Sequence, residues 1–256
     1  MTGKASGRKA AEPLPLNQAD WHQRYQKQAQ WTRQLRSYFF DKFNLPDKAA
    51  ILEVGCGTGA VLGDYTATRS TFGLDIDWQA LSYCQQINPA IKLTCGDTHV
   101  LPFADASFNL SFCHYLLLWL GDPLRALQEM KRVTRPGSWV CAFAEPDYGG
   151  RVAFPQALAY LADLQCESLS RQSAETGMGR QLSHLFIECG LKEIESGVLA
   201  AEWGQIASQL EGELQIMKND LAAIGKGREF EGYQKQITDN DGTIYYIPTF
   251  YAAGRA

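Results

Sequence analysis

A glycine-rich turn that follows an apolar run is the first feature of this sequence to imply chemistry. Residues 51–59 read Ile-Leu-Glu-Val-Gly-Cys-Gly-Thr-Gly. Without Cβ atoms, Gly55, Gly57 and Gly59 permit a tight turn and let a ligand lie against the backbone beside a helix N-terminus. Glu53 adds an acid beneath that turn, which repels a pyrophosphate but suits a ligand with an ammonium group. The motif therefore favours an amino-acid-like ligand.

Two further acids follow the next two apolar runs. Asp75 ends the run Phe72-Gly73-Leu74-Asp75, 20 residues after Gly55. A carboxylate at the end of the second strand of such a fold can accept hydrogen bonds from both hydroxyls of a ribose. The run that ends at Gly96-Asp97-Thr98 supplies another carboxylate, which can accept a hydrogen bond from an exocyclic amine. Together the acids predict a ligand that contains adenosine.

These motifs resemble those of class I S-adenosylmethionine-dependent methyltransferases, the broad group that includes quinone-biosynthesis and other small-molecule enzymes. The resemblance covers residues 25–254, and residues 53–59 match the family's first motif completely. It implies S-adenosylmethionine as the cofactor. The cofactor-binding residues it implies are Glu53, Gly55, Cys56, Gly57, Gly59, Asp75, Ile76, Gly96, Asp97, Thr98 and His114.

The resemblance also implies a role for each position. Glu53 and the 55–59 turn would lie near the methionine moiety, and Asp75 would bind the ribose. Ile76 would pack against adenine, while Asp97 with Thr98 would contact its amine. No metal is implied, because no cysteine–histidine cluster has the spacing of a zinc site.

Two other interpretations of the glycine turn compete with this one. Residues 55–60 also satisfy a loose GxGxxA pattern, and Asp75 stands at the distance expected of a nicotinamide dehydrogenase. Glu53 and the Gly96-Asp97 pair have no role in dinucleotide binding, which favours the methyltransferase. A turn that serves packing alone would not require three alternate glycines followed by two correctly placed acids.

The alternation of short apolar runs with helical patterns predicts an α/β fold with a parallel sheet. We expect a Rossmann-like, seven-stranded, mostly parallel sheet with flanking helices, an antiparallel last strand and a helical N-terminal cap. The expected strands are 50–54, 71–75, 91–95, 108–113, 138–144, 191–200 and 244–254. The expected helices are 21–43, 59–67, 77–87, 122–134, 154–174, 179–190 and 203–224.

The expected domain organisation is simple, because 256 residues suit one α/β domain with a cap. Residues 1–16 are predicted to be a disordered leader, and 17–256 a methyltransferase domain. Within it, 17–48 would form the helical cap and 49–150 the cofactor-binding half. Residues 151–256 would supply the substrate-side helices and the last two strands.

His114 ends the fourth predicted strand, where the acceptor normally approaches the methyl group. It could act as a general base, because an imidazole titrates near neutrality. Alternatively it packs against the cofactor and forms hydrogen bonds without moving a proton, which is the favoured interpretation. The segment lacks the Asn/Asp-Pro-Pro-Tyr tetrapeptide of relatives that methylate nucleobase amines.

The loop after the fifth predicted strand, residues 145–151, carries acids, an aromatic and a cation among glycines. Such loops bind ligands in open α/β sheets. We therefore expect Asp147, Tyr148 and Arg151 to contact the acceptor. The alternative is an ordinary Pro-Asp and Gly-Gly turn with solvated charges.

The composition of the chain limits its expected binding partners and its expected cellular compartment. The net charge of −4 gives no cationic excess for phosphates, so nucleic acid is disfavoured. Seven cysteines without a CxxC pair fit free thiols in a reducing cytoplasm, and no apolar run approaches a membrane span. The leading hypothesis is a methyltransferase acting on a small molecule. A protein or RNA methyltransferase and a non-catalytic cofactor-binding domain remain as alternatives.

Overall fold

The computed structural model describes residues 17–199, 206–239 and 242–256. The predicted leader, residues 1–16, lies outside this range, as do residues 200–205 at the predicted start of a helix. The chain begins with two helices, α1 (Gln18–Trp31) and α2 (Arg33–Phe43), where one helical stretch was expected. Asn17 and Asp20 form a capping box that fixes the start of α1, and Thr32 separates the two helices.

A seven-stranded sheet forms the body of the molecule, in the order β3-β2-β1-β4-β5-β9-β7. The five strands that run parallel are β1 (Ala50–Val54), β2 (Ser70–Asp75), β3 (Lys92–Cys95), β4 (Phe108–Cys113) and β5 (Thr134–Pro146). β9 (Thr249–Arg255) lies antiparallel between β5 and β7 (Lys192–Leu199). This architecture confirms the predicted Rossmann-like sheet with an antiparallel last strand.

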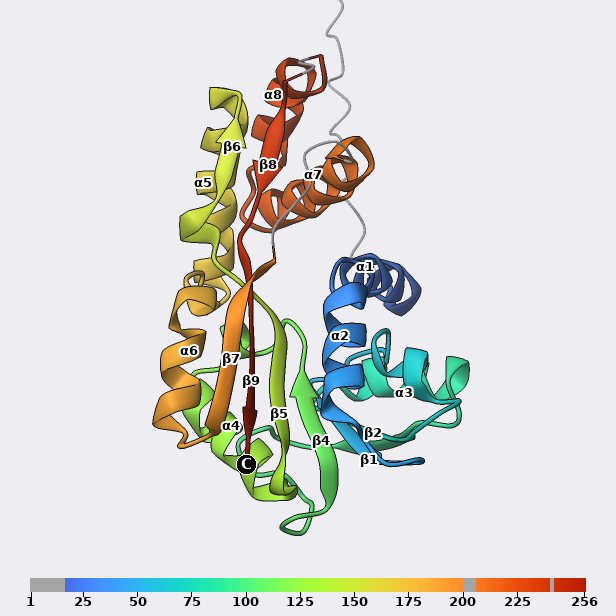
Figure 1. Cartoon of the computed structure of the whole chain (residues 1–256). Helices are drawn as coiled ribbons and strands as arrows, with labels where there is room; N and C mark the ends of the chain where they lie inside the picture. Colours follow the sequence, from blue (N-terminus) through green and yellow to red (C-terminus); the bar gives the residue numbers. More distant parts are fainter. Residues whose placement is uncertain (1–16, 200–205, 240–241) are drawn as a thin grey trace, which may run out of the picture.

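Helices flank this sheet on both faces (Figure 1). α3 (Trp78–Ile87) begins where the Asp77 side chain accepts from two backbone N–H groups, and α4 (Pro123–Val133) begins at a similar Asp122 cap. α6 (Met178–Glu188) packs with α4 against one face, while α2 covers the other. Consequently both faces of the central strands are buried, as their continuous apolar runs predict.

A second group of elements extends beyond the carboxyl end of β5. The two-stranded ribbon of β6 (Val152–Phe154) and β8 (Ile244–Tyr246) is accompanied by three helices with their own apolar core. These helices are α5 (Gln156–Arg171), α7 (Ile206–Ala223) and α8 (Gly227–Thr238). Figure 1 shows this group beyond one end of the main sheet, with α7 above α1.

Two predictions about elements were wrong. Residues 59–67 do not form an α-helix but a turn with the short 3₁₀ helix η1 (Leu62–Tyr65), because Gly59 has a positive φ of 73°. The single strand expected over 244–254 is divided into β8 and β9, with Pro248 in the connection. Two further short 3₁₀ helices, η2 (Leu117–Trp119) and η3 (Tyr148–Gly150), follow β4 and β5.

Candidate active site

The glycine turn after β1 needs glycine for both conformation and space. Gly55 and Gly59 have φ values of 72° and 73°, a region that other residues rarely adopt. A Cβ at Gly55 would lie 2.6 Å from Leu116 Cδ1, and one at Gly59 would lie 2.4 Å from Cys84 Sγ. The backbone N–H groups of Gly55 and Cys56 both donate to the carbonyl of Leu74. The turn is therefore fixed to the end of β2.

Glu53 is buried beneath this turn, at 2% exposure. Its Oε2 atom is buried and has no hydrogen-bond partner among the described residues. Burial raises its pKa to about 8, although the charge of Arg36 and a hydrogen bond from Leu62 oppose the shift. A buried carboxyl oxygen without a partner is costly, so this atom is available to a ligand's ammonium group. The residues present thus fit the methionine end of the implied cofactor.

Asp75 lies at the carboxyl end of β2, next to the turn. One carboxylate oxygen accepts from the Gly57 backbone N–H at 2.7 Å and the other from Asp77 at 2.9 Å. Each oxygen keeps a lone pair for a further donor. Ile76 follows with a 73% exposed side chain. Asp75 and Ile76 therefore lie side by side at the rim, as their predicted contacts with ribose and adenine require.

The third acid, Asp97, follows β3 and is ordered by its neighbour His99. Asp97 Oδ1 accepts from the His99 backbone N–H at 2.9 Å and lies 2.7 Å from His99 Nδ1. These hydrogen bonds lower the pKa of Asp97, so it is ionised at neutral pH. Thr98 is buried beside it. The second oxygen of Asp97 makes no hydrogen bond to the described residues, and so can accept from an amine.

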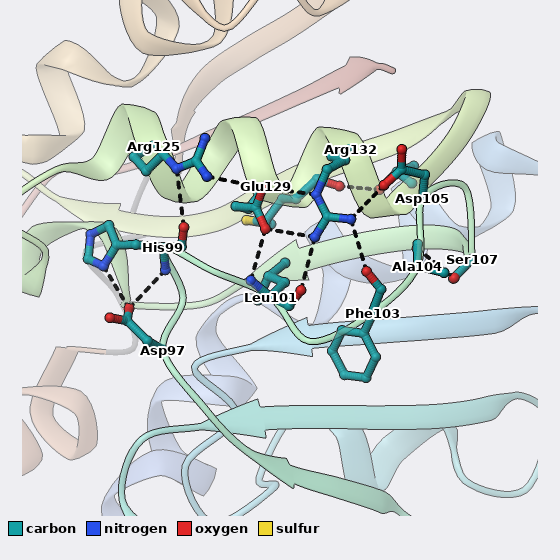
Figure 2. A network of polar contacts seen from close by, with 12 residues as sticks. Asp97, His99, Leu101, Phe103, Ala104, Asp105, Ser107, Arg125, Glu129 and Arg132 are labelled. Atoms are coloured by element: carbon teal, nitrogen blue, oxygen red, sulfur yellow. Dashed lines mark hydrogen bonds and ion pairs between the residues drawn. The ribbon is translucent and has the colours of Figure 1, made fainter.

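An ion-pair network fixes the segment that carries Asp97 to α4 (Figure 2). Glu129 is buried and accepts from the Leu101 backbone N–H at 2.9 Å and from Arg132 at 2.7 and 2.9 Å. Arg132 also donates to the carbonyls of Leu101 and Phe103. Arg125 donates to the carbonyl of His99 at 3.2 Å. No local sequence pattern indicates these residues, because their hydrogen bonds join segments about 30 residues apart in the chain.

Helix α1 closes over the glycine turn. His22 is buried, and its Nδ1 lies 2.9 Å from Thr58 Oγ1. Tyr25 lies beside the turn, since a Cβ at Gly57 would meet its Cε2 at 3.5 Å. Burial raises the pKa of Tyr25, and the charges of Asp75 and Asp77 add to the shift. α1 thus covers the cofactor end of the sheet, the position expected of the helical cap.

The His114 side chain is held by Thr32, the residue between α1 and α2, and not by an acid. Its Nε2 lies 2.8 Å from Thr32 Oγ1, which also accepts from Arg36 Nε at 3.2 Å. Arg36 is 1% exposed and pairs with Asp64. Burial and the Arg36 charge lower the pKa of His114 to about 3. The imidazole is therefore neutral at physiological pH, and it is far too weak a base to accept a proton efficiently at neutral pH.

Glu145 shapes the end of β4 from the neighbouring strand. Its carboxylate accepts from the backbone N–H groups of Leu116, Leu117 and Leu118 at 2.9–3.1 Å. It is fully buried, and burial raises its pKa to about 7. Tyr115, directly before these residues, has a positive φ of 54°. Glu145, expected in a loop, is thus part of β5 and fixes the segment after His114.

Two of the three residues predicted to contact the acceptor, Asp147 and Arg151, have side-chain partners within the protein. Asp147 is buried and accepts from Arg180 twice at 2.7 Å. Arg151 donates to the carbonyl of Tyr148 at 2.6 Å and pairs with Asp163. Their contact with an acceptor stays a prediction. Of the three, Tyr148 alone has no hydrogen bond from its side chain to the described residues.

Comparison with known proteins agrees with this geometry. Residues 52–142 match the model of a methyltransferase domain. A demethylmenaquinone methyltransferase of Renibacterium salmoninarum is 33% identical over 121 residues, 46% of this chain and 51% of that protein. A malonyl-[acyl-carrier protein] O-methyltransferase of Pseudescherichia vulneris is 31% identical over 119 residues, 46% of this chain and 47% of that protein.

A solved structure extends the likeness to most of the fold. The complex of Haemonchus contortus phosphoethanolamine N-methyltransferase 2 with S-adenosyl-L-methionine superposes with a TM-score of 0.56 at 13% identity, covering 84% of this chain and 50% of that one. The chain spans about half the length of the curated relatives it matches. It contains a methyltransferase domain of the class I, S-adenosylmethionine-dependent type, which confirms the class that the glycine motif predicts.

Proposed function

We propose that this chain is a methyltransferase that transfers the methyl group of S-adenosylmethionine to a small-molecule acceptor. One observation carries the cofactor assignment: the buried, unpartnered Oε2 of Glu53 beneath the glycine turn. An ammonium group donates to that oxygen and favours the ionised carboxyl, whereas the pyrophosphate of a dinucleotide brings no donor to it and disfavours its ionisation. The names of the relatives and the class of the domain support the same cofactor.

The residues around the turn divide the work of binding. Glu53 and the backbone of residues 55–59 would hold the methionine end, and Asp75 would accept from the ribose hydroxyls. Ile76 would cover adenine, and Asp97 with Thr98 would contact its amine. Gly96 leaves room for the adenine, and Cys56 contributes its backbone because its side chain is buried.

When bound, the cofactor supplies a methyl group on a sulfonium, and the chain's task is to hold an acceptor in line with it in a dry site. Glu145 and the 3₁₀ turn η2 fix the backbone after β4, which would form the floor of the acceptor site. His114, held neutral by burial, serves as a packing and positioning group. α1 excludes water from the cofactor end.

Several observations support a small acceptor in the cytoplasm. The net charge of −4 disfavours nucleic acid. One relative is a demethylmenaquinone methyltransferase, and demethylmenaquinone is a small molecule. All seven cysteines lie in the described residues and are unpaired, which suits a reducing compartment. None of the described helices is long and apolar enough to cross a bilayer.

The test is methyl transfer from radiolabelled S-adenosylmethionine into separated cell-extract fractions: small molecules, protein and RNA. We expect label in the small-molecule fraction. Asp75→Ala should weaken cofactor binding by about 1.5–3 kcal/mol, the scale of a hydrogen bond to a charged group. Label confined to protein or RNA would overturn the acceptor class. Cofactor binding without transfer to any fraction would favour a non-catalytic domain.

A further inference from the structure

A buried chain of hydrogen bonds joins the break between α1 and α2 to the carboxyl end of β4. Arg36 Nε donates to Thr32 Oγ1 at 3.2 Å, and Thr32 Oγ1 lies 2.8 Å from His114 Nε2. The side chains of Arg36 and Thr32 are buried, at 1% and 0% exposure. Water therefore does not compete for these hydrogen bonds, which are strong in such surroundings. We call Arg36, Thr32 and His114 the Arg36–His114 relay.

The guanidinium of Arg36 is fixed by partners at all three of its nitrogens. Its Nη2 donates to the Ala29 carbonyl at 2.7 Å. Its Nη1 donates to Asp64 Oδ2 and to Tyr65 Oη, both at 3.2 Å. A guanidinium only donates hydrogen bonds and never accepts them. The contact between Nε and Thr32 Oγ1 is therefore a hydrogen bond in which the threonine oxygen accepts.

The hydroxyl of Thr32 has a single proton and two groups that could accept it. The Ala29 carbonyl lies at 3.3 Å and His114 Nε2 at 2.8 Å. A hydroxyl usually donates to oxygen over about 2.5–3.0 Å, so the contact with Ala29 is long. That carbonyl also accepts from Arg36 already. A cationic donor on the threonine oxygen strengthens the hydroxyl as a donor, and these features together favour His114 Nε2 as its acceptor.

The His114 ring lies beside the glycine turn of the proposed cofactor site. Leu116, two residues later, contacts that turn, since a Cβ at Gly55 would lie 2.6 Å from Leu116 Cδ1. The His114 side chain is half-buried, and its Nδ1 has no hydrogen-bond partner in the described part of the chain. Nor is this atom sealed from solvent as Glu53 Oε2 is. The two ring nitrogens point in diverging directions, so Nδ1 faces away from Thr32 and is open to a ligand.

We propose that Arg36 and Thr32 are positioning residues that hold His114 in the tautomer with its proton on Nδ1, so that the ring presents a hydrogen-bond donor to the bound ligands. A neutral imidazole donates from one nitrogen and accepts at the other. Because Nε2 accepts from Thr32, Nδ1 carries the proton. His114 thus offers an N–H where a general base would need a lone pair.

The partner of this N–H is an oxygen that accepts a hydrogen bond. Two ligands of the proposed reaction can supply it: the carboxylate at the methionine end of the cofactor, or a carbonyl or carboxylate oxygen of the methyl acceptor. A donor fixed in one tautomer costs no reorganisation when either oxygen arrives. This inference rests on the proposed function and adds a defined role for three residues to it.

The tautomer is measured by 15N NMR of the full chain, labelled at its histidines, at pH 7. A protonated and an unprotonated ring nitrogen differ widely in chemical shift, and their couplings to the ring C–H protons distinguish Nδ1 from Nε2. The signals of His114 are those that His114→Gln removes. We expect a protonated Nδ1 and an unprotonated Nε2. A proton found on Nε2 would overturn the proposal without any variant of the relay.

Thr32→Val tests the hydroxyl at nearly constant side-chain volume. Without that donor at Nε2, we expect the single tautomer of His114 to be lost and a signal of protonated Nε2 to appear. Thr32→Ser restores a hydroxyl and should restore the proton to Nδ1. Thr238→Val, at an exposed threonine of α8, is the matched control. A Thr32→Val protein with an unchanged circular dichroism spectrum and an unchanged His114 tautomer would contradict the role of Thr32.

Arg36→Gln tests the other end of the relay. Its loss frees the Ala29 carbonyl, which then competes for the hydroxyl proton of Thr32. We therefore expect a mixture of the two His114 tautomers. Arg33→Gln, an exposed neighbour on α2 that also lies near Asp64, is the control and should keep one tautomer. If Arg36→Gln kept one tautomer as well, Arg36 would not be a positioning residue.

Two nucleosides then identify the oxygen that His114 binds. S-adenosylhomocysteine carries the amino-acid carboxylate, and methylthioadenosine lacks it. A downfield shift of the Nδ1 proton with S-adenosylhomocysteine alone would assign the oxygen to the cofactor. The same spectrum with both would assign it to the methyl acceptor. A move of the proton to Nε2 with either nucleoside would overturn the proposal. If calorimetry showed no binding of S-adenosylhomocysteine, the proposed function would fail, whereas the tautomer of the free chain would still stand.

Discussion

Glu53 is central to the proposed cofactor site, because the protonation state of its carboxyl should change when the cofactor binds. Burial raises its pKa to about 8, so at pH 7 the free protein holds a proton on this carboxyl. An ammonium group beside it favours the ionised form. Cofactor binding at pH 7 should therefore release a proton.

Calorimetric titration of S-adenosylhomocysteine at pH 7, in buffers of different ionisation enthalpy, measures this release. We expect close to one proton released by the unchanged chain and none through this site by Glu53→Gln. The release should vanish above about pH 9, where Glu53 is already ionised. If the unchanged chain and Glu53→Gln released the same number of protons, Glu53 would not be the group that binds the ammonium.

His114 leads to a different expectation at the same scale. With a pKa of about 3, its protonation state does not change between pH 5 and pH 9. Glutamine preserves a hydrogen bond to Thr32, so His114→Gln should keep turnover at saturation within a few-fold. A general base would instead cost about 10²–10⁴-fold. Turnover measured across this pH range distinguishes the two roles, and a loss of the larger size would restore the histidine as the base.

At the scale of elements, the segment that carries Asp97 depends on Glu129 of α4. The pKa of Glu129 is lowered, mainly by the Arg132 hydrogen bond. A lowered pKa means that Glu129 stabilises the fold above its ordinary pKa of 4.5, and that this contribution is lost as the pH falls through the folded-state pKa. Glu129→Gln would leave Arg132 partly unpaired beside a buried amide.

We expect Glu129→Gln to lower the free energy of unfolding at pH 7 by about 1–3 kcal/mol, the cost of an unsatisfied buried group. Urea unfolding at pH 7 and pH 4 measures it, and the difference from the unchanged chain should shrink at the lower pH. Glu231→Gln, an exposed position on α8, is the control. Equal stability of the two variants at pH 7 would contradict a structural role for the network.

Much of the element order could be predicted from local patterns. The first three strands are short apolar runs that end at an aspartate or directly before a glycine, and aspartate caps mark α3 and α4. The error at 59–67 arose because a helical pattern of side chains says nothing of the positive φ at Gly59. β6 and β8 have three residues each and form only by pairing with one another across the chain. α8 was missed although Phe230 and Ile237 lie on a buried apolar face, because most of its other residues are polar.

The candidate site divides in the same way. Glu53, the glycines, Asp75 and Asp97 were predictable as candidates because each lies at or just beyond the carboxyl end of a strand, and parallel strands bring these ends together. Arg36 and Glu129 were not, since each forms hydrogen bonds with a segment distant in the sequence. Arg180 belongs here too, because only the fold shows that it pairs with Asp147. One sequence signal was available for Arg36. It is a charged residue on the apolar face of a predicted helix, which indicates a buried polar contact.

At the scale of the whole molecule, the fold places a cofactor-binding sheet under α1 and a separate helical group beyond its carboxyl edge. The sheet supplies the features shared by the class, whereas α7 and the β6–β8 ribbon supply this chain's own residues. The class is therefore carried by the glycine turn and its acids.

The most direct test of the central claim is calorimetric titration of the purified chain with S-adenosylhomocysteine and, separately, with NAD. We expect saturable binding of S-adenosylhomocysteine to the unchanged chain. Asp75→Ala should weaken this binding by about 1.5–3 kcal/mol and leave the circular dichroism spectrum unchanged. We expect no saturable binding of NAD, because its pyrophosphate brings no hydrogen-bond donor to the buried Glu53 oxygen beneath the turn. Tight NAD binding with no response to S-adenosylhomocysteine would contradict the account.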